Sequence, residues 1–181
     1  MKNFILGILS TLVAIALVGF AYLRLGYAEV RADVPASRFE AALLGPALQA
    51  SIRRQAPDIS NPVLATRETL VAGGKLYLAE CSGCHGELEK GKGGSPTALL
   101  PSPPQFSSVG TALSESQIFW VAKHGIRRTG MFANGQWDAD DKLWQVAAFL
   151  KRVNSLSPDV RDAILAAQQP APASATANQP K

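Results

Sequence analysis

The sequence predicts an all-α globular domain preceded by one apolar helix, and three observations indicate this fold class. Apolar residues recur at helical spacing in most segments from Ser37 onward. Capping residues stand where several of these periodic segments begin and end. The chain contains no alternating strand pattern of useful length, no internal repeat and no phosphate-binding glycine motif.

Composition excludes several classes of protein. The 181 residues are 47% hydrophobic, which is too apolar for a wholly disordered chain and is enough for one globular domain with appendages. The formal charge of +4 comes without a dense run of Lys and Arg, so no nucleic-acid partner is indicated. Only two cysteines are present, three positions apart, which excludes a scaffold of several disulfides.

The N-terminus has the length of a membrane span. Phe4 to Leu23 contains no charged residue, and a helix of this length covers about 30 Å, the thickness of a bilayer's hydrocarbon core. The apolar region of a cleaved signal peptide is shorter, about 7–15 residues. We therefore expect residues 1–27 to be a transmembrane anchor or an uncleaved signal. Lys2 before the span and Arg24 and Arg31 after it leave its orientation open.

Residues 28–60 are predicted to form a helical arm or linker. Ser37 to Ala56 has apolar residues near helical spacing, and Pro46 is expected to kink this helix or split it in two. We expect its apolar stripe to pack on the following domain, with a juxtamembrane amphipathic helix as the alternative.

Residues 61–156 are predicted to be the globular domain. A helical pattern runs from Thr66 into Cys81, and Ser114 with Gln117 forms a capping box for a helix that stops at Gly125. Asp138 to Asp141 are expected to supply caps and negative charge to a last strong helix.

The remaining residues, 157–181, are predicted to form a short helix and a tail. Ser157-Pro158 starts the helix, with Ser as its N-cap and Pro in its first position. Gln168 to Lys181 is rich in Pro, Ala and Gln without an apolar period, so we expect it to be disordered.

The chemistry concentrates in the run Cys81-Ser82-Gly83-Cys84-His85, the C-x-x-C-H spacing of a c-type haem attachment. On a helical turn these two thiols and the imidazole share one face. The thiols can then form thioethers to the haem vinyl groups while the imidazole faces the iron. A zinc site would need more ligands than the chain offers nearby, and a redox dithiol would need a βαβ pattern. The run therefore predicts one covalently attached haem c, with Cys81, Cys84 and His85 as site residues.

Two residues are candidates for the second axial ligand of the iron. Met131 is the only internal methionine, and it lies in a loop after a helix that can carry the chain to the opposite haem face. His124 is the competitor, although a histidine at a helix end is more often a surface residue stabilised by the helix dipole. We favour Met131.

The chain resembles the small monohaem cytochromes c. The run from Gly73 to Gly86 is similar to that family's first helix and haem motif. Ile118 to Met131 is similar to its central helix and methionine loop, and Trp144 to Leu150 to its C-terminal helix. The resemblance covers about Asn61 to Leu156, and the anchor and arm are similar to those of a membrane-anchored bacterial subgroup.

The resemblance implies an all-α globule around the haem, in which the first and last helices cross. It implies Met131 as the sixth ligand, and a proline carbonyl that orients His85. Pro96, Pro103 and Pro104 all fit that role, and Pro104 stands as the candidate. Haem is attached outside the cytoplasm in this family. The resemblance therefore implies an anchor in the bacterial cytoplasmic membrane with the C-terminal domain in the periplasm.

Further residues are assigned candidate roles around the haem. Trp137 and the pair Arg127-Arg128 are candidate partners of the haem propionates, with a core-edge Trp and solvated arginines as the alternative. Apolar residues expected to raise the reduction potential are Leu99, Leu100, Phe106, Phe119 and Phe149. A docking ring for an acidic redox partner, or ordinary surface, is formed by Lys75, Lys90, Lys92 and Lys123.

These residues predict one-electron transfer rather than catalysis, because histidine–methionine ligation leaves no open site on the iron. We expect an electron carrier, alone or as a subunit of an oxidoreductase complex. Its expected partners are membrane redox proteins and the lipid bilayer. The alternative is a haem-based sensor or enzyme subunit whose sixth ligand is labile.

Overall fold

The computed structural model describes residues 1–31, 33–88 and 99–166. Lys90, Lys92, Pro96 and the segment Gln168 to Lys181, for which roles were predicted above, lie outside these residues. The chain divides into two compact units, Met1–Ala32 and Asp33–Lys181. Within the described residues every regular element is a helix and no strand occurs, which confirms the predicted all-α class.

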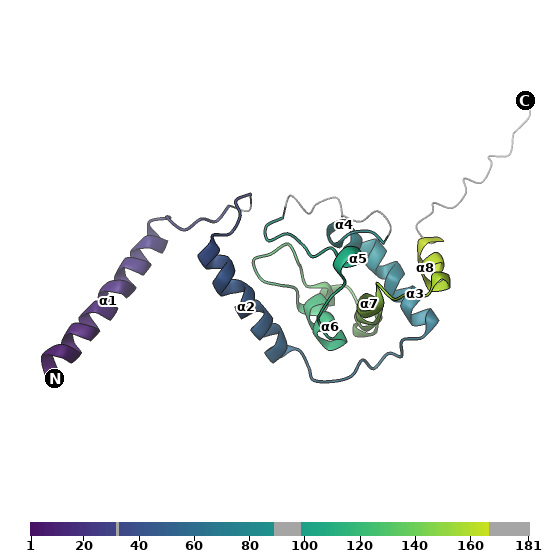
Figure 1. Cartoon of the computed structure of the whole chain (residues 1–181), viewed down its shortest axis with the longest axis horizontal. Coiled ribbons are helices and arrows are strands. Elements are labelled where there is room, and N and C mark those ends of the chain that lie inside the picture. Colours follow the sequence, from purple (N-terminus) through teal and green to yellow (C-terminus); the bar gives the residue numbers. More distant parts are fainter. Residues whose placement is uncertain (32, 89–98, 167–181) are drawn as a thin grey trace, which may run out of the picture. The chain divides into compact units, whose positions relative to one another are not determined.

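The elements along the described chain are all helical, and Figure 1 labels α1 to α8 among them. In order they are α1 (Lys2–Arg24), α2 (Arg38–Gln55), α3 (Arg67–Leu76), the π-helical turn η1 (Tyr77–Cys81), α4 (Ser82–His85), α5 (Phe106–Val109), α6 (Glu115–His124), the 3-10 turn η2 (Asn134–Gln136), α7 (Asp140–Arg152) and α8 (Pro158–Leu165).

The first unit contains one helix. α1 has 23 residues and none of them is buried. At 1.5 Å per residue it is about 35 Å long, so by length and composition it is able to cross a membrane. This agrees with the predicted apolar helix at the N-terminus.

α2 corrects one prediction and narrows another. Pro46 lies inside one continuous helix, so of the two outcomes expected at this proline the split does not occur. The apolar stripe does not pack on the domain as a whole. Only Ile52 is buried, where α2 contacts α6, while Phe39 is 78% exposed and Leu43 57%. The helix carries apolar residues on more than one face, and the domain covers only one of them.

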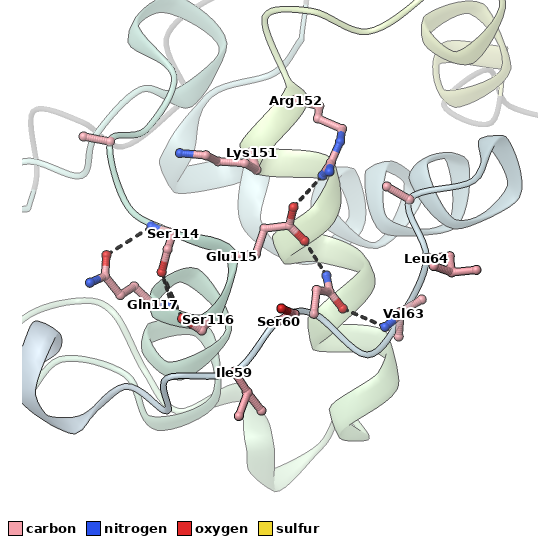
Figure 2. A pocket seen from close by; sticks show the side chains of 13 residues that line it. Ile59, Ser60, Val63, Leu64, Ser114, Glu115, Ser116, Gln117, Lys151 and Arg152 are labelled. Carbon is pink, nitrogen blue, oxygen red and sulfur yellow. Dashed lines mark hydrogen bonds and ion pairs between the residues drawn. The ribbon is translucent and has the colours of Figure 1, made fainter.

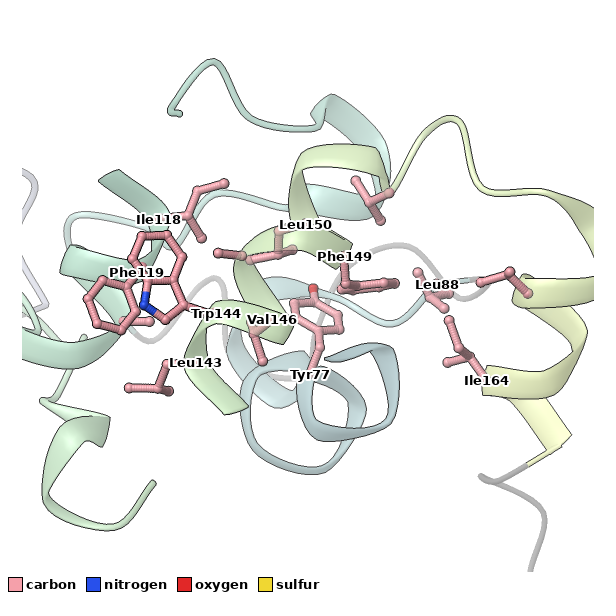
Figure 3. Close-up of a cluster of buried hydrophobic side chains, with 14 residues drawn as sticks. Tyr77, Leu88, Ile118, Phe119, Leu143, Trp144, Val146, Phe149, Leu150 and Ile164 are labelled. Carbon is pink, nitrogen blue, oxygen red and sulfur yellow. The ribbon is translucent and has the colours of Figure 1, made fainter. Parts of the chain in front are cut away.

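The core of the second unit forms where α3 crosses α7. A side-chain carbon added at Gly73 would collide with the backbone carbonyl of Gln145, so only a glycine permits this approach. Aromatic rings from α6 and from η1 also pack against rings of α7, as Figure 3 shows. Phe119 stacks on Trp144 with ring centroids 4.1 Å apart, and Tyr77 lies 5.3 Å from Phe149. The motif turn that follows α3 is thus attached to a close-packed core.

α8 belongs to this core although it lies beyond residue 156. Its Val160 and Ile164 are buried, and Ile164 packs onto Gly74 of α3, where a larger residue would collide with it. Arg67 and Asp159 add an ion pair of 3.0 Å between the two helices. The first helix of the domain is therefore covered by α7 and α8 together.

The helix ends follow the sequence with one exception. The capping box forms at the N-terminus of α6, where Ser114 accepts from the amide of Gln117, and α6 ends before Gly125. At α7, however, the N-cap is Ala139, and no aspartate caps the helix. Asp138 is instead buried and lies 3.6 Å from Lys142 Nζ, because its side chain turns inward rather than along the helix axis.

Candidate haem site

The Cys81–His85 run spans the junction of two short helices. Cys81 ends the π-helical turn η1, and Cys84 and His85 lie on α4. A π-helical turn inserts one extra residue into a helix and occurs often at functional sites. The Ser82 hydroxyl donates to Leu78 O at 2.7 Å and ties α4 to the turn before it. The two cysteines are free thiols, so no disulfide competes with thioether formation.

Tyr77 holds the end of the motif in place. Its hydroxyl donates to the carbonyl oxygens of His85 at 3.0 Å and Gly86 at 2.6 Å. Gly86 has a φ of +90°, which a residue with a side chain rarely adopts. The Tyr77 side chain is fully buried, and this burial raises the pKa of the phenol well above its usual value, so the hydroxyl remains a donor.

The His85 ring is fixed by a backbone carbonyl. Nδ1 lies 2.9 Å from Pro104 O, and since a carbonyl only accepts, Nδ1 carries the proton. Nε2 therefore keeps its lone pair. Burial lowers the pKa of His85 while the bond to Pro104 opposes that shift, so the ring is neutral. Phe106 stacks on the ring at 4.7 Å.

The segment that presents Pro104 is itself bonded to the motif. Gln105 Nε2 donates to Cys84 O at 2.9 Å and to Pro103 O at 3.0 Å. Of the three prolines considered from the sequence, Pro104 is the one whose carbonyl reaches His85, and Pro96 lies outside the described residues. Nothing in the residue spacing distinguished Pro103 from Pro104, because the choice depends on the path of the loop.

The motif fits a covalently bound porphyrin. Burial raises the pKa of the Cys81 thiol to about 12, with smaller contributions from the charges of Glu80 and Asp138. The thiol is therefore protonated and lies in apolar surroundings, which suit a hydrophobic macrocycle. A neutral imidazole with a free Nε2 and two thiols in adjacent turns form the donor set that haem c requires.

The methionine loop is held by bonds within itself. Ile126 N donates to Met131 O at 2.9 Å, and Thr129 Oγ1 accepts from Met131 N at 3.1 Å. Gly125, with a φ of +66°, lies so close to this loop that a side-chain carbon would be 2.7 Å from Met131 O. Met131 is half-buried. The backbone of the loop therefore has a defined conformation around the methionine.

The methionine loop also touches the loop that carries Pro104. A side-chain carbon at Gly130 would lie 2.9 Å from Leu99 Cδ1. The structure thus brings Gly130, the residue before Met131, against the loop that carries Pro104, although the two are far apart in sequence.

Other predicted site residues lie at the surface. His124 is exposed, with its ring 5.2 Å from Trp120. Trp137 is 69% exposed and packs edge-on against Phe132, and Arg127 is exposed as well.

The residues predicted to shield the haem and those predicted to dock a partner differ in their burial and pairing. Phe119 and Phe149 are buried in the helical core. Leu99 and Leu100 are half-buried in the loop after the motif, and Phe106 is half-buried at the start of α5. Lys75 is exposed, whereas Lys123 lies 2.7 Å from Asp140, so its charge is already paired.

Sequence reasoning missed an acidic pair beside the motif. Glu80 lies next to Asp138, and the pKa of Glu80 is raised by burial first and by the hydrogen bond and charge of Asp138 next, with Lys142 opposing. The two residues are far apart in the sequence, and Asp138 was expected to be a helix cap. No local pattern reports such a pair.

A surface groove lies on another part of the domain, between residues 59–65 and the ends of α6 and α7 (Figure 2). Its centre is an ion-pair network. Glu115 accepts from Asn61 Nδ2 at 2.6 Å and from Arg152 at 2.7 Å, and Asn61 also donates to Trp144 O. These bonds fasten residues 59–65, which lead into the domain, to α6 and α7. The polar residues of the groove therefore have a structural role.

Comparison with known proteins supports the site. The family described as cytochrome C oxidase, cbb3-type, subunit III, matches residues 68–150, which include the haem motif and Met131. Among solved structures, a chain of the Kuenenia stuttgartiensis reducing HAO-like protein complex is similar at 21% identity, with a TM-score of 0.45. The similarity covers 65% of this chain and 61% of that one. No curated protein matches the sequence. With the C-x-x-C-H turn, the oriented histidine and the family match together, the segment 68–150 is a monohaem c-type cytochrome domain that binds haem c.

Proposed function

We propose that the protein is a membrane-tethered electron carrier whose haem iron has His85 and Met131 as axial ligands. A cytochrome c domain transfers electrons, and the proposal concerns the ligands, the tether and the place where the transfer occurs. On this proposal, the domain lies in the periplasm and exchanges single electrons with redox proteins of the bacterial cytoplasmic membrane.

The observation that carries the proposal is the bond from His85 Nδ1 to Pro104 O. It fixes the tautomer, so Nε2 is the atom that faces the iron. It also holds the ring plane, and Phe106 stacked on that plane limits its rotation. A histidine held in this way would present Nε2 to the iron in one orientation.

Met131 is the better candidate for the opposite side of the haem. It is half-buried in a loop of defined backbone that adjoins the Pro104 segment, whereas His124 is exposed at the end of α6. If His85 and Met131 both held the haem iron, no position would remain for small ligands, and the chemistry would be limited to electron exchange. Methionine ligation raises the reduction potential.

Bound haem supplies a metal centre that gains and loses one electron. The residues of the chain hold this centre in one geometry through both states. Tyr77 and Gln105 fix the motif backbone, and Pro104 fixes the imidazole. Little rearrangement is then required when the charge changes.

The length and composition of α1 support the proposed tether. A helix of this length and composition favours a single membrane span, and covalent haem attachment outside the cytoplasm favours a periplasmic domain. Confinement to the membrane raises the effective concentration of the carrier near membrane-bound donors and acceptors.

Absorption spectroscopy of the purified full chain tests the ligands. We expect a low-spin reduced spectrum and, in the oxidised protein, the weak red charge-transfer band of a methionine–iron bond. Met131→Ala removes this band and allows carbon monoxide to bind, whereas His124→Ala, the matched control, leaves both properties unchanged.

The opposite result contradicts the proposal. A wild-type protein that is high-spin and binds carbon monoxide readily would favour the sensor or enzyme alternative. Loss of the low-spin spectrum in His124→Ala would assign the ligand to His124.

A further inference from the structure

We propose that α2 lies on the membrane surface, with the face formed by Phe39, Leu43, Pro46 and Ala50 inserted among the lipid headgroups. This inference rests on the proposed membrane tether. It assigns a function to the arm between the anchor and the cytochrome domain, which is to hold the domain close to the bilayer.

The geometry of the helix separates this face from the one that meets the domain. At about 100° per residue, Leu43 lies about 180° around the helix from Ile52. Ile52 is 2% exposed against the domain and Leu43 is 57% exposed. When α2 packs on the domain through Ile52, Leu43 therefore points away from it.

The outward face is continuous. Phe39, Pro46 and Ala50 all fall within about 60° of Leu43 on the helix surface. Phe39 is 78% exposed, more than Leu43 or Leu44 of the same helix. A helix of 18 residues, about 27 Å long, thus has an apolar ridge that no described residue covers.

Two arginines border the C-terminal end of this ridge. Arg53 and Arg54 lie about 50° to either side of its centre, and both are exposed. Neither forms an ion pair with any residue that the structure describes. An apolar ridge with arginines along its edges is the arrangement of helices that lie in a bilayer interface and attract anionic lipids.

The chain around α2 favours the bilayer over a soluble partner. Residues 25–37 connect α1 to α2 and can reach at most roughly 45 Å, so a membrane-spanning α1 keeps α2 near the surface. The connector begins with Leu25, Tyr27 and Val30, each more than two-thirds exposed. Aromatic and apolar residues just outside a span are typical of the interfacial zone. The connector thus carries the residue types expected between a membrane span and a helix in the interface.

Spin labels on the full-length haem-loaded protein in vesicles test the inference. One label replaces Leu43 (Leu43→Cys) and a matched label replaces Ala41 (Ala41→Cys), which is also exposed and lies about 160° away. A third replaces Leu12 within α1 (Leu12→Cys). Accessibility to oxygen, which enters lipid, and to a nickel chelate, which stays in water, is measured in phosphatidylcholine vesicles with and without phosphatidylglycerol.

We expect the label at position 43 to be accessible to oxygen and protected from the nickel chelate, and the label at position 41 to show the reverse. Phosphatidylglycerol should increase the protection at position 43, and Arg53→Gln with Arg54→Gln should remove that increase. Position 12 should be protected in every vesicle.

Two results overturn the inference and differ from failure of the tether. If position 43 is as accessible to the chelate as position 41 while position 12 is protected, α2 does not touch lipid although the anchor spans. If position 43 is shielded from both reagents, and dilution of the protein in lipid reverses this, a second copy covers the ridge. A chelate-accessible position 12 would instead contradict the tether itself.

Discussion

The two sides of the haem site are held in different ways. On the histidine side, Tyr77, Pro104 and Gln105 form bonds to motif residues that lie 8 to 21 positions away in the sequence, and the motif follows a helix packed against α7. On the methionine side, the bonds to Met131 come from Ile126 and Thr129 in the same loop. The histidine side is therefore part of the domain core, and the methionine side depends on a local turn. We expect damage to the histidine side to lower the stability of the whole domain, and damage to the methionine side to act mainly on the ligand, with a smaller loss of stability.

The largest loss of stability is expected from Gly73→Ala, because it displaces α3, the helix that leads into the histidine side of the site. The added carbon would collide with the Gln145 carbonyl, and overpacking of this kind costs about 2–3 kcal/mol. Denaturant unfolding followed by circular dichroism measures the change. Gly45→Ala in α2 is the control, since nothing lies within 4 Å of its added carbon. Equal stability of the two variants would show that α3 and α7 do not approach so closely.

The second-largest loss of stability is expected from Tyr77→Phe. It removes the hydroxyl that bonds His85 O and Gly86 O, and carbonyls left without a partner in a buried place cost about 1–3 kcal/mol. The free energy of unfolding should fall by this amount. Tyr27→Phe, at an exposed tyrosine, should change it by less than about 0.5 kcal/mol. A Tyr77 variant as stable as the Tyr27 variant would mean that the phenol does not anchor the motif.

A smaller effect on stability is expected on the methionine side. Thr129→Val removes the acceptor of Met131 N and the donor to Ile126 O, at a cost of about 1 kcal/mol. The methionine–iron charge-transfer band should weaken and carbon monoxide binding should appear. Thr111→Val removes a similar turn bond, to Leu113 N, outside the site, and should leave the band unchanged. An unaltered band in Thr129→Val would contradict a locally held methionine loop.

The smallest effect concerns Glu80 and depends on pH. Because the pKa of Glu80 is raised in the folded state above 4.5, its ionised form opposes folding at neutral pH, and protonation relieves this as the pH falls. Glu80→Gln should therefore raise Tm at pH 7, and the difference should vanish below a pH of about 4, where the carboxyl is protonated in both states.

Glu68→Gln is the control of opposite sign. The pKa of Glu68 is lowered, by a bond to its own backbone amide first and then by Thr66, so its charge favours folding above 4.5. This variant should lower Tm at pH 7. Tm changes of the same sign in both variants would mean that the Glu80–Asp138 pair is not strained.

Local signals in the sequence were sufficient to predict the haem motif and the start of α6. The haem motif is a run of five residues, and the capping box of Ser114 and Gln117 depends only on neighbours in the chain. The histidine's carbonyl partner was not fixed, because Pro103 and Pro104 differ only in how the loop is folded. Asp138 was expected to cap α7 and instead turned inward beside Glu80, a contact that the fold creates.

The fate of apolar faces was the least predictable feature. α2 and α7 both have apolar residues at helical spacing, yet α7 is buried along most of its length and α2 buries only Ile52. Periodicity identifies a face that prefers to leave water, and it does not say whether protein or lipid will cover that face. α8 differed from its prediction in the opposite way. The sequence placed this short helix outside the domain, yet its Ile164 packs on Gly74 and completes the burial of α3.

Near-infrared magnetic circular dichroism of the oxidised full chain tests the central claim most directly, because the energy of the porphyrin-to-iron band identifies the pair of axial ligands. The account predicts the signature of one histidine and one methionine in a low-spin iron. A signature of two histidines, or of a high-spin iron with one protein ligand, would contradict it.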